Sequence, residues 1–153
     1  MPVRRFPQRQ RRGATMVETA LVLSTALLLT LGVIIVGLGV YRYQQVASLA
    51  RVAARYASVH GGQFALDTGQ SKATSQSVYD QVIKPGAIGL DLSKLTYSVT
   101  WDNANEMPIY LANTTTNQYV RNRVTVTISY QWVPEAYLKG ITLTSTSVME
   151  MYY

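Results

Sequence analysis

The chain has 153 residues, a formal net charge of +6 and no cysteine. This length corresponds to about one domain, and the lack of cysteine excludes disulfides and cysteine-ligated metals. Of the 14 basic residues, five arginines precede Gly13, and the remaining nine face eight acidic residues, a net charge of +1. A nucleic-acid-binding domain carries its positive charge on the fold, so the composition argues against nucleic acid as a partner. The five arginines are Arg4, Arg5, Arg9, Arg11 and Arg12.

Residues 1–13 form a basic leader, for which Pro2 and Pro7 favour disorder, and an apolar segment follows. Thr19 to Val40 is a run of 22 residues without charge or proline. As a helix it spans ~33 Å, enough to cross a bilayer core of ~30 Å. The arginines lie before this run, so the positive-inside rule predicts a single-pass protein of the inner (cytoplasmic) membrane. The N-terminus is then cytoplasmic, and residues 59–153 form a small extracytoplasmic domain.

The helical pattern continues beyond the apolar run without a breaker until Gly61-Gly62. We expect one helix over residues 14–58, about 44 residues and ~65 Å long, with its membrane-spanning part at about 19–40. Its outer half would be marginal alone, so it should pack against its own domain, against neighbouring copies, or both. Two faces are expected there: a small-residue stripe of Ala47, Ala50, Ala54 and Ala57, and a polar face of Gln45, Ser48, Arg51 and Arg55.

The remaining chain predicts a small α+β domain. Residues 61–70 are read as a glycine-rich connector, and residues 71–84 as a short amphipathic helix that Pro85-Gly86 stops. Its inward side chains would be Val78, Val82 and Ile83, with Ala73 a further candidate. Residues 102–119 are expected to form a polar loop.

Three strands are predicted from alternating apolar residues. The first carries Leu95, Tyr97, Val99 and Trp101; the second, 120–132, carries Val124, Val126, Ile128 and Tyr130; the third, 141–151, carries Ile141, Leu143 and, as further candidates, Met149 and Met151. We therefore expect an α+β fold with a long N-terminal helix, a short helix and a small three-stranded antiparallel sheet.

Catalytic groups are scarce. His60 is the only histidine, and we interpret it as a helix-end or solvated residue. No metal-ligand set, phosphate-binding loop or cofactor motif is present. Asp67-Thr68-Gly69 is similar to the nucleophile loop of aspartic proteases, but such enzymes need two carboxylates, and no strand is predicted before it. Asn113-Thr114-Thr115 is a weak glycosylation sequon. We expect no enzyme activity, no cofactor and no metal.

The most specific pattern lies at the start of the apolar segment. Residues 11–32 read RRGATMVETALVLSTALLLTLG, in which Arg11, Arg12 and Gly13 are followed by Glu18 and then by the apolar run. With the continuation YRYQQVASLARVAARYAS, it resembles the TadE-like family, minor pilin-like proteins of the tight-adherence (Tad/Flp) pilus and secretion apparatus. The resemblance covers residues 11–58. Thr19 stands where the family often has an aromatic residue.

The resemblance implies processing by a prepilin peptidase after Gly13, which makes Ala14 the first residue and Glu18 the fifth. The Glu18 carboxylate could then pair with the amine of a neighbouring pilin-like subunit during assembly. The alternative is that Glu18 lies in the interfacial region and favours the helix N-terminus through the dipole. Gly32, Gly37 and Gly39 could allow close helix packing in lipid, although glycine is common in membrane helices.

Two function classes remain open at this point. The first is a pilin-like minor subunit or assembly factor without catalysis, whose partners are membrane lipid, a prepilin peptidase and other subunits of the apparatus. The second is an unprocessed bitopic membrane protein with an extracytoplasmic binding domain. A secreted protein cut near Gly39 fits poorly, because the apolar run is long and the helix continues beyond it.

Overall fold

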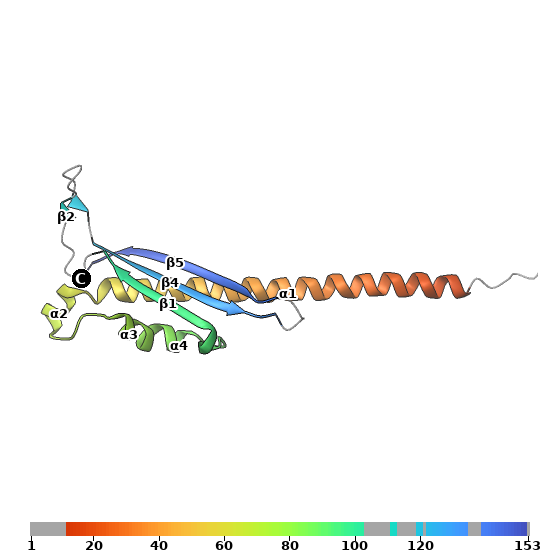
Figure 1. Ribbon diagram of the computed structural model, residues 1–153, viewed down its shortest axis with the longest axis horizontal. Coiled ribbons are helices and arrows are strands. Elements are labelled where there is room, and N and C mark those ends of the chain that lie inside the picture. Colours follow the sequence, from red (N-terminus) through yellow and green to blue (C-terminus); the bar gives the residue numbers. More distant parts are fainter. Residues whose placement is uncertain (1–11, 103–110, 113–118, 121, 135–138, 153) are drawn as a thin grey trace, which may run out of the picture. The chain divides into compact units, whose positions relative to one another are not determined.

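The structure is a computed structural model that describes residues 12–102, 111–112, 119–120, 122–134 and 139–152. The chain divides into two compact units, Met1–Leu38 and Gly39–Tyr153. Helix α1, Arg12–Val59, contributes to both units and is drawn from red to yellow in Figure 1. With the short helices and the antiparallel sheet of the second unit, the fold is α+β, as predicted.

The first unit is described only through α1. Its side chains are exposed from Met16 to Leu38, except for the half-buried Gly32 and Ile35. The helix is made of leucine, valine, alanine and other residues that tolerate helical backbone, and no proline interrupts it. An apolar helix without a covering layer of protein needs a non-aqueous environment.

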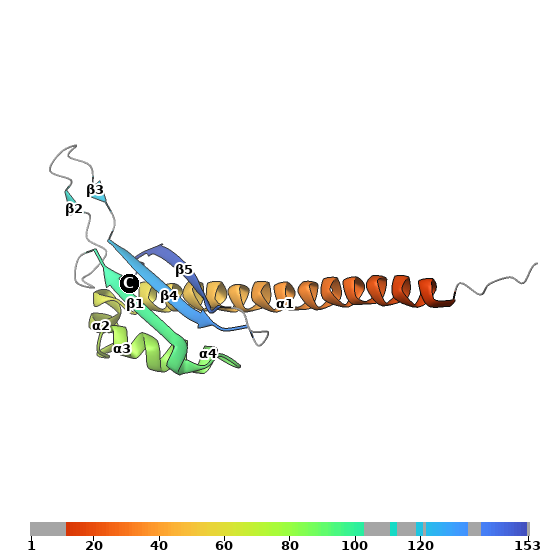
Figure 2. The ribbon, with the colours of Figure 1, turned by 45° about the vertical axis from the view of Figure 1, so that its right-hand side comes forward.

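In the second unit a three-stranded antiparallel sheet has the order β1-β4-β5. The strands are β1, Leu95–Trp101; β4, Arg123–Trp132; and β5, Ile141–Glu150. In the register, Ile128 at the centre of β4 lies opposite Tyr97 of β1 and Ser145 of β5. Figures 1 and 2 show the sheet lying along the C-terminal part of α1.

One face of the sheet and one face of α1 form the core. The sheet contributes buried side chains from two strands: Leu95, Val99, Val124, Val126, Ile128 and Tyr130. The helix contributes Val46, Leu49, Ala50, Ala53, Ala54 and Ala57. The alternation predicted for β1 and β4 is therefore confirmed. The opposite face of the sheet is rich in threonine and serine, and the hydroxyls of Thr127 and Ser129 bond those of Thr146 and Thr144 at 3.0 and 2.9 Å.

The short helices lie between α1 and β1 in the chain. They are α2, Gly62–Thr68; α3, Ser75–Val78; the π-helical turn η1, Tyr79–Ile83; α4, Lys84–Gly86; and the 3₁₀ turn η2, Leu92–Lys94. A capping box starts α3, because the Thr74 hydroxyl accepts the backbone N–H of Ser77 at 3.1 Å. Ala73, Val78 and Ile83 are buried and Val82 packs against the core, as the helical pattern predicts.

Four details differ from the sequence prediction. The connector predicted over 61–70 contains α2, because Gly61 and Gly69 occupy the two caps of a short helix. The helix predicted over 71–84 begins only at Ser75, after the Thr74 cap, and ends at Gly86, within the predicted stop. The predicted loop over 102–119 contains a two-residue strand β2, Leu111–Ala112, which pairs with a second short strand β3, Tyr119–Val120. The second long strand therefore begins at Arg123 and not at residue 120. On β5, Leu143 and Met149 are half-buried, whereas Ile141 is exposed; Met151 is buried beyond the strand end.

Candidate functional site

The first half of α1 is the candidate functional segment. A window of 18 residues in this helix has a mean hydropathy of 2.6, and none of that window is buried in the structure. Length and composition alone therefore suffice for this helix to cross a membrane. A core helix of a water-soluble fold would instead be covered by other elements.

The hydroxyl groups of this segment are satisfied inside the helix. Thr19, Thr25 and Thr30 each donate to the carbonyl oxygen four residues earlier, over 2.8, 2.9 and 2.7 Å. Ser24 donates to the carbonyl of Leu21 at 3.0 Å. These four side chains thus bring no unpaired O–H donor into a hydrocarbon layer, where each would cost several kcal/mol.

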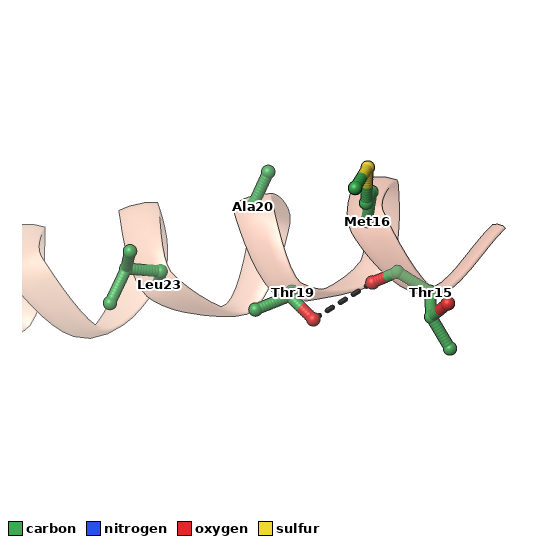
Figure 3. Close-up of a pocket in the computed structure, with 5 residues that line it drawn as sticks. All are labelled: Thr15, Met16, Thr19, Ala20 and Leu23. Atoms are coloured by element: carbon green, nitrogen blue, oxygen red, sulfur yellow. Dashed lines mark hydrogen bonds between the residues drawn. The ribbon is translucent and has the colours of Figure 1, made fainter. Parts of the chain in front are cut away.

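A shallow groove runs along one face of the helix near its start. Figure 3 shows the lining side chains and the bond from Thr19 to the carbonyl of Thr15; the lining residues are Thr15, Met16, Thr19, Ala20 and Leu23. All five come from a single helix, so the groove is a surface depression and not an enclosed site. Small side chains at its centre leave room for another helix or an acyl chain.

Glu18 is exposed on α1, and its carboxylate has no hydrogen bond or ion pair within the described part of the chain. It is the seventh residue of a helix that begins at Arg12. The favourable effect of a helix dipole on an acid falls off within the first turn, so this position gains little from it.

Gly13 is exposed in the first turn of α1, and a Cβ added there would meet no atom within 4 Å. Its backbone is helical, so neither packing nor conformation requires glycine at this position. Ala14 is helical, and its side chain is not described. Arg12 opens α1, whereas Arg4, Arg5, Arg9 and Arg11 lie outside the described residues.

The other glycines of the segment divide into two kinds. A Cβ at Gly32 or Gly37 would meet nothing within 4 Å, so the chain's own fold does not use their small size. A Cβ at Gly39 would lie only 2.9 Å from Cζ3 of Trp132. The sequence pattern gave no indication of this Gly39–Trp132 contact, because the two residues are 93 positions apart.

The outer half of α1 has the two predicted faces. Ala50, Ala54 and Ala57 are buried under the sheet, and Ala47 is half-buried. Ser48, Arg51 and Arg55 are exposed on the polar face, and Gln45 is half-buried. The outer half therefore packs against its own domain and leaves a polar, positively charged face.

The side chains that sequence reasoning considered for chemistry lie apart from one another. His60 stacks on Tyr56 with ring centroids 3.9 Å apart, and its Nδ1 lies 2.9 Å from the Tyr56 carbonyl oxygen. Burial raises the pKa of the Tyr56 phenol above its usual range. Asp67 lies exposed on helix α2, where Gln63 donates to it at 2.9 Å. Within the described residues no group of three or more metal-binding side chains occurs. The sequon at Asn113 lies outside the described residues.

Comparison with known proteins gives one result. No match was found among curated proteins or among solved structures. The family model described as TadE-like protein matches residues 13–55, which begin at the glycine of the predicted processing site and cover most of α1. Over this segment the chain is a match to the TadE-like family, and the resemblance predicted from its residues is confirmed there.

Proposed function

We propose that this chain is a pilin-like minor subunit or assembly factor of a Tad/Flp-type pilus or secretion apparatus and has no catalytic activity. The observation that supports the proposal best is that the TadE-like match at 13–55 includes the whole exposed apolar half of α1. In this proposal α1 anchors the chain in the inner membrane, with the N-terminus cytoplasmic. Residues 14–58 form the helix and residues 59–153 the extracytoplasmic domain.

Processing after Gly13 is the first part of the proposal. A peptidase that threads the chain through its site favours a small, flexible residue, and the fold itself gives no reason for glycine at this position. The mass of the protein recovered from membranes of its native host measures the cleavage directly. Gly13→Val should leave the leader attached, whereas the control Gly37→Ala should still be cleaved. A wild-type chain recovered with residues 1–13 intact would refute processing.

Glu18 is proposed to act in assembly. At membrane depth an unpaired carboxylate costs about 2.5–3.5 kcal/mol. After cleavage at Gly13, the α-amine of Ala14 on a neighbouring subunit could pair with it. Glu18→Gln should therefore lower recovery of the chain in the assembled apparatus without lowering its amount in the membrane. Asp67→Asn removes the same charge from an exposed helix of the domain and serves as the control. Equal recovery of both variants would contradict this role.

The absence of native cysteine makes the orientation easy to test. Gln8→Cys, placed in the Gly13→Val chain that is expected to keep its leader, reports the N-terminal tail, and Ser93→Cys reports the exposed surface of the domain. In intact cells stripped of their outer membrane, an impermeant maleimide should label Ser93→Cys and not Gln8→Cys. The reverse labelling would refute the proposed orientation.

The alternative is an unprocessed bitopic membrane protein whose extracytoplasmic domain binds a partner. It shares the membrane helix and the orientation with the main proposal. It differs in two results, because it requires an intact leader and no effect of Glu18→Gln on assembly. The mass measurement and the Glu18 variant together therefore separate the two functions.

A further inference from the structure

We propose that the domain binds the membrane surface through a second contact, a ring of apolar side chains around the point where α1 enters it. The proposal rests on the membrane anchoring proposed above. We call this surface the membrane-proximal rim, and its residues come from four separate segments of the second unit: Tyr41, Tyr43, Ile88, Trp132, Val133 and Ile141. Its occupant is the interfacial layer of the lipid bilayer, in which aromatic side chains are enriched.

The contact of Trp132 with Gly39 places the end of β4 at the start of this unit. A helix that begins its span near Thr19 covers a ~30 Å core in about 20 residues, which ends the span at about Leu38. Gly39 is the next residue, and the Trp132 ring lies against it. The indole therefore lies at the level where hydrocarbon gives way to headgroups.

The other rim residues are held at the same end by specific contacts. Ile141 lies opposite Trp132 in the β4–β5 register, and Val133 follows Trp132 directly. The loop after α4 is tied to α1, because Arg42 Nη1 donates to the Gly89 carbonyl at 2.6 Å. Figures 1 and 2 show α4, the end of β4 and the start of β5 at the end of the second unit opposite α2.

The rim is apolar and open. Trp132 is half-buried against Gly39, and the other five side chains are between 45% (Tyr43) and 79% (Ile88) exposed. Other exposed large apolar residues of the unit, such as Val52, Leu66 and Val148, lie singly on α1, α2 and β5. Single exposed apolar residues are ordinary on a protein surface, whereas a cluster next to a membrane-spanning helix marks a lipid contact.

The two tryptophans of the chain allow a direct test. Trp101 lies opposite Val124, and Val124 is eight residues from Trp132 on β4. The backbone positions of the two tryptophans are therefore about 27 Å apart along the strand direction. Trp101→Phe leaves Trp132 as the sole indole, and Trp132→Phe leaves Trp101. The full chain is placed at one copy per nanodisc of phosphatidylcholine that carries bromine on its acyl chains near the headgroup.

In this test the bromines should quench most of the Trp132 emission and leave the Trp101 emission unchanged. Leu28→Trp in a chain that lacks both native tryptophans reports insertion of α1, with bromines deep in the acyl chains. Quenching of Leu28→Trp without quenching of Trp132 would overturn the rim contact and keep the membrane anchor. Loss of quenching at both positions would refute the rim and the proposed anchoring together.

Discussion

Replacing Ala54 by leucine should destabilise the domain, because the sheet leaves no space on the face of α1 that it covers. Ala50, Ala53, Ala54 and Ala57 are all 0% exposed and belong to the core that α1 forms with the sheet and the short helices. Extra methylene groups in a filled core force displaced side chains and cost about 1–3 kcal/mol. In a domain near 100 residues each kcal/mol lowers the melting temperature by about 4–8 °C. We therefore expect Ala54→Leu to melt at least about 4 °C below the wild-type chain.

The assay is thermal unfolding of the full chain in detergent, followed by tryptophan fluorescence and near-ultraviolet circular dichroism. Ser48→Leu is the matched control, since it places the same side chain on the exposed face of the same helix. It should change stability by no more than about 0.5 kcal/mol. Equal melting of the two variants would refute the packing of the sheet on the alanine face.

Three further predictions concern the second unit. Ile128→Ala, at a fully buried position of the central strand, should lower the free energy of unfolding by denaturant by about 2–5 kcal/mol. The control Thr127→Ala, on the outer face of the sheet, should lower it by about 1 kcal/mol or less. Gly69→Ala should increase hydrogen exchange in α2, because this cap residue has a φ of 70° that alanine adopts only with strain. The side-chain and backbone hydrogen bonds from Ser93 lower the pKa of Asp91. The stabilisation from the Asp91 carboxylate is therefore present above about pH 4 and lost as pH falls through the lowered value. Ser93→Ala should raise the pKa of Asp91 in an NMR titration.

Periodicity predicted the parts of the fold in which one face is covered along its whole length. β1 and β4 alternate because one face packs on α1, so Val99, Val126 and Ile128 could be identified as core from the sequence. Ile141 lies on the same face of β5 as Leu143, as predicted, but its side chain is exposed. The first residue of β5 lies at the edge of the core, and alternation along a strand does not show where the core ends.

The glycines misled the prediction in a different way. Gly61 and Gly69 were interpreted as part of a glycine-rich connector, but each occupies a cap of a short helix, where glycine is also favoured. Pro85-Gly86 was predicted to stop the next helix, which ends at Gly86 and includes Pro85 in its last turn. The π-helical turn before it shifts the hydrogen bonding by one residue, so that Lys84 N–H donates to the Tyr79 carbonyl. The widened turn leaves room for the proline ring.

The sequence could reveal those features of the candidate segment that are contiguous in the chain. It could not reveal contacts between residues that are far apart in the chain. The pattern from Gly13 through Glu18 to the apolar run is contiguous, and the family match covers it. The Gly39–Trp132 contact joins residues 93 positions apart and has no periodic signal. From the sequence alone, a glycine at the end of an apolar run is interpreted as a residue for helix packing or flexibility, because its long-range neighbour is not known.

The free energies of membrane insertion show which step Glu18 can influence. Twelve aliphatic side chains from Val17 to Leu38 are more than half exposed. Transfer of each from water to lipid is worth about 1.5–3 kcal/mol, so together they favour insertion by on the order of 20 kcal/mol. An unpaired carboxylate opposes this by only about 2.5–3.5 kcal/mol. Insertion therefore tolerates Glu18 whether or not it is paired, so a phenotype of Glu18→Gln must arise later, at processing or at subunit contact, and the mass of the variant chain separates these two steps.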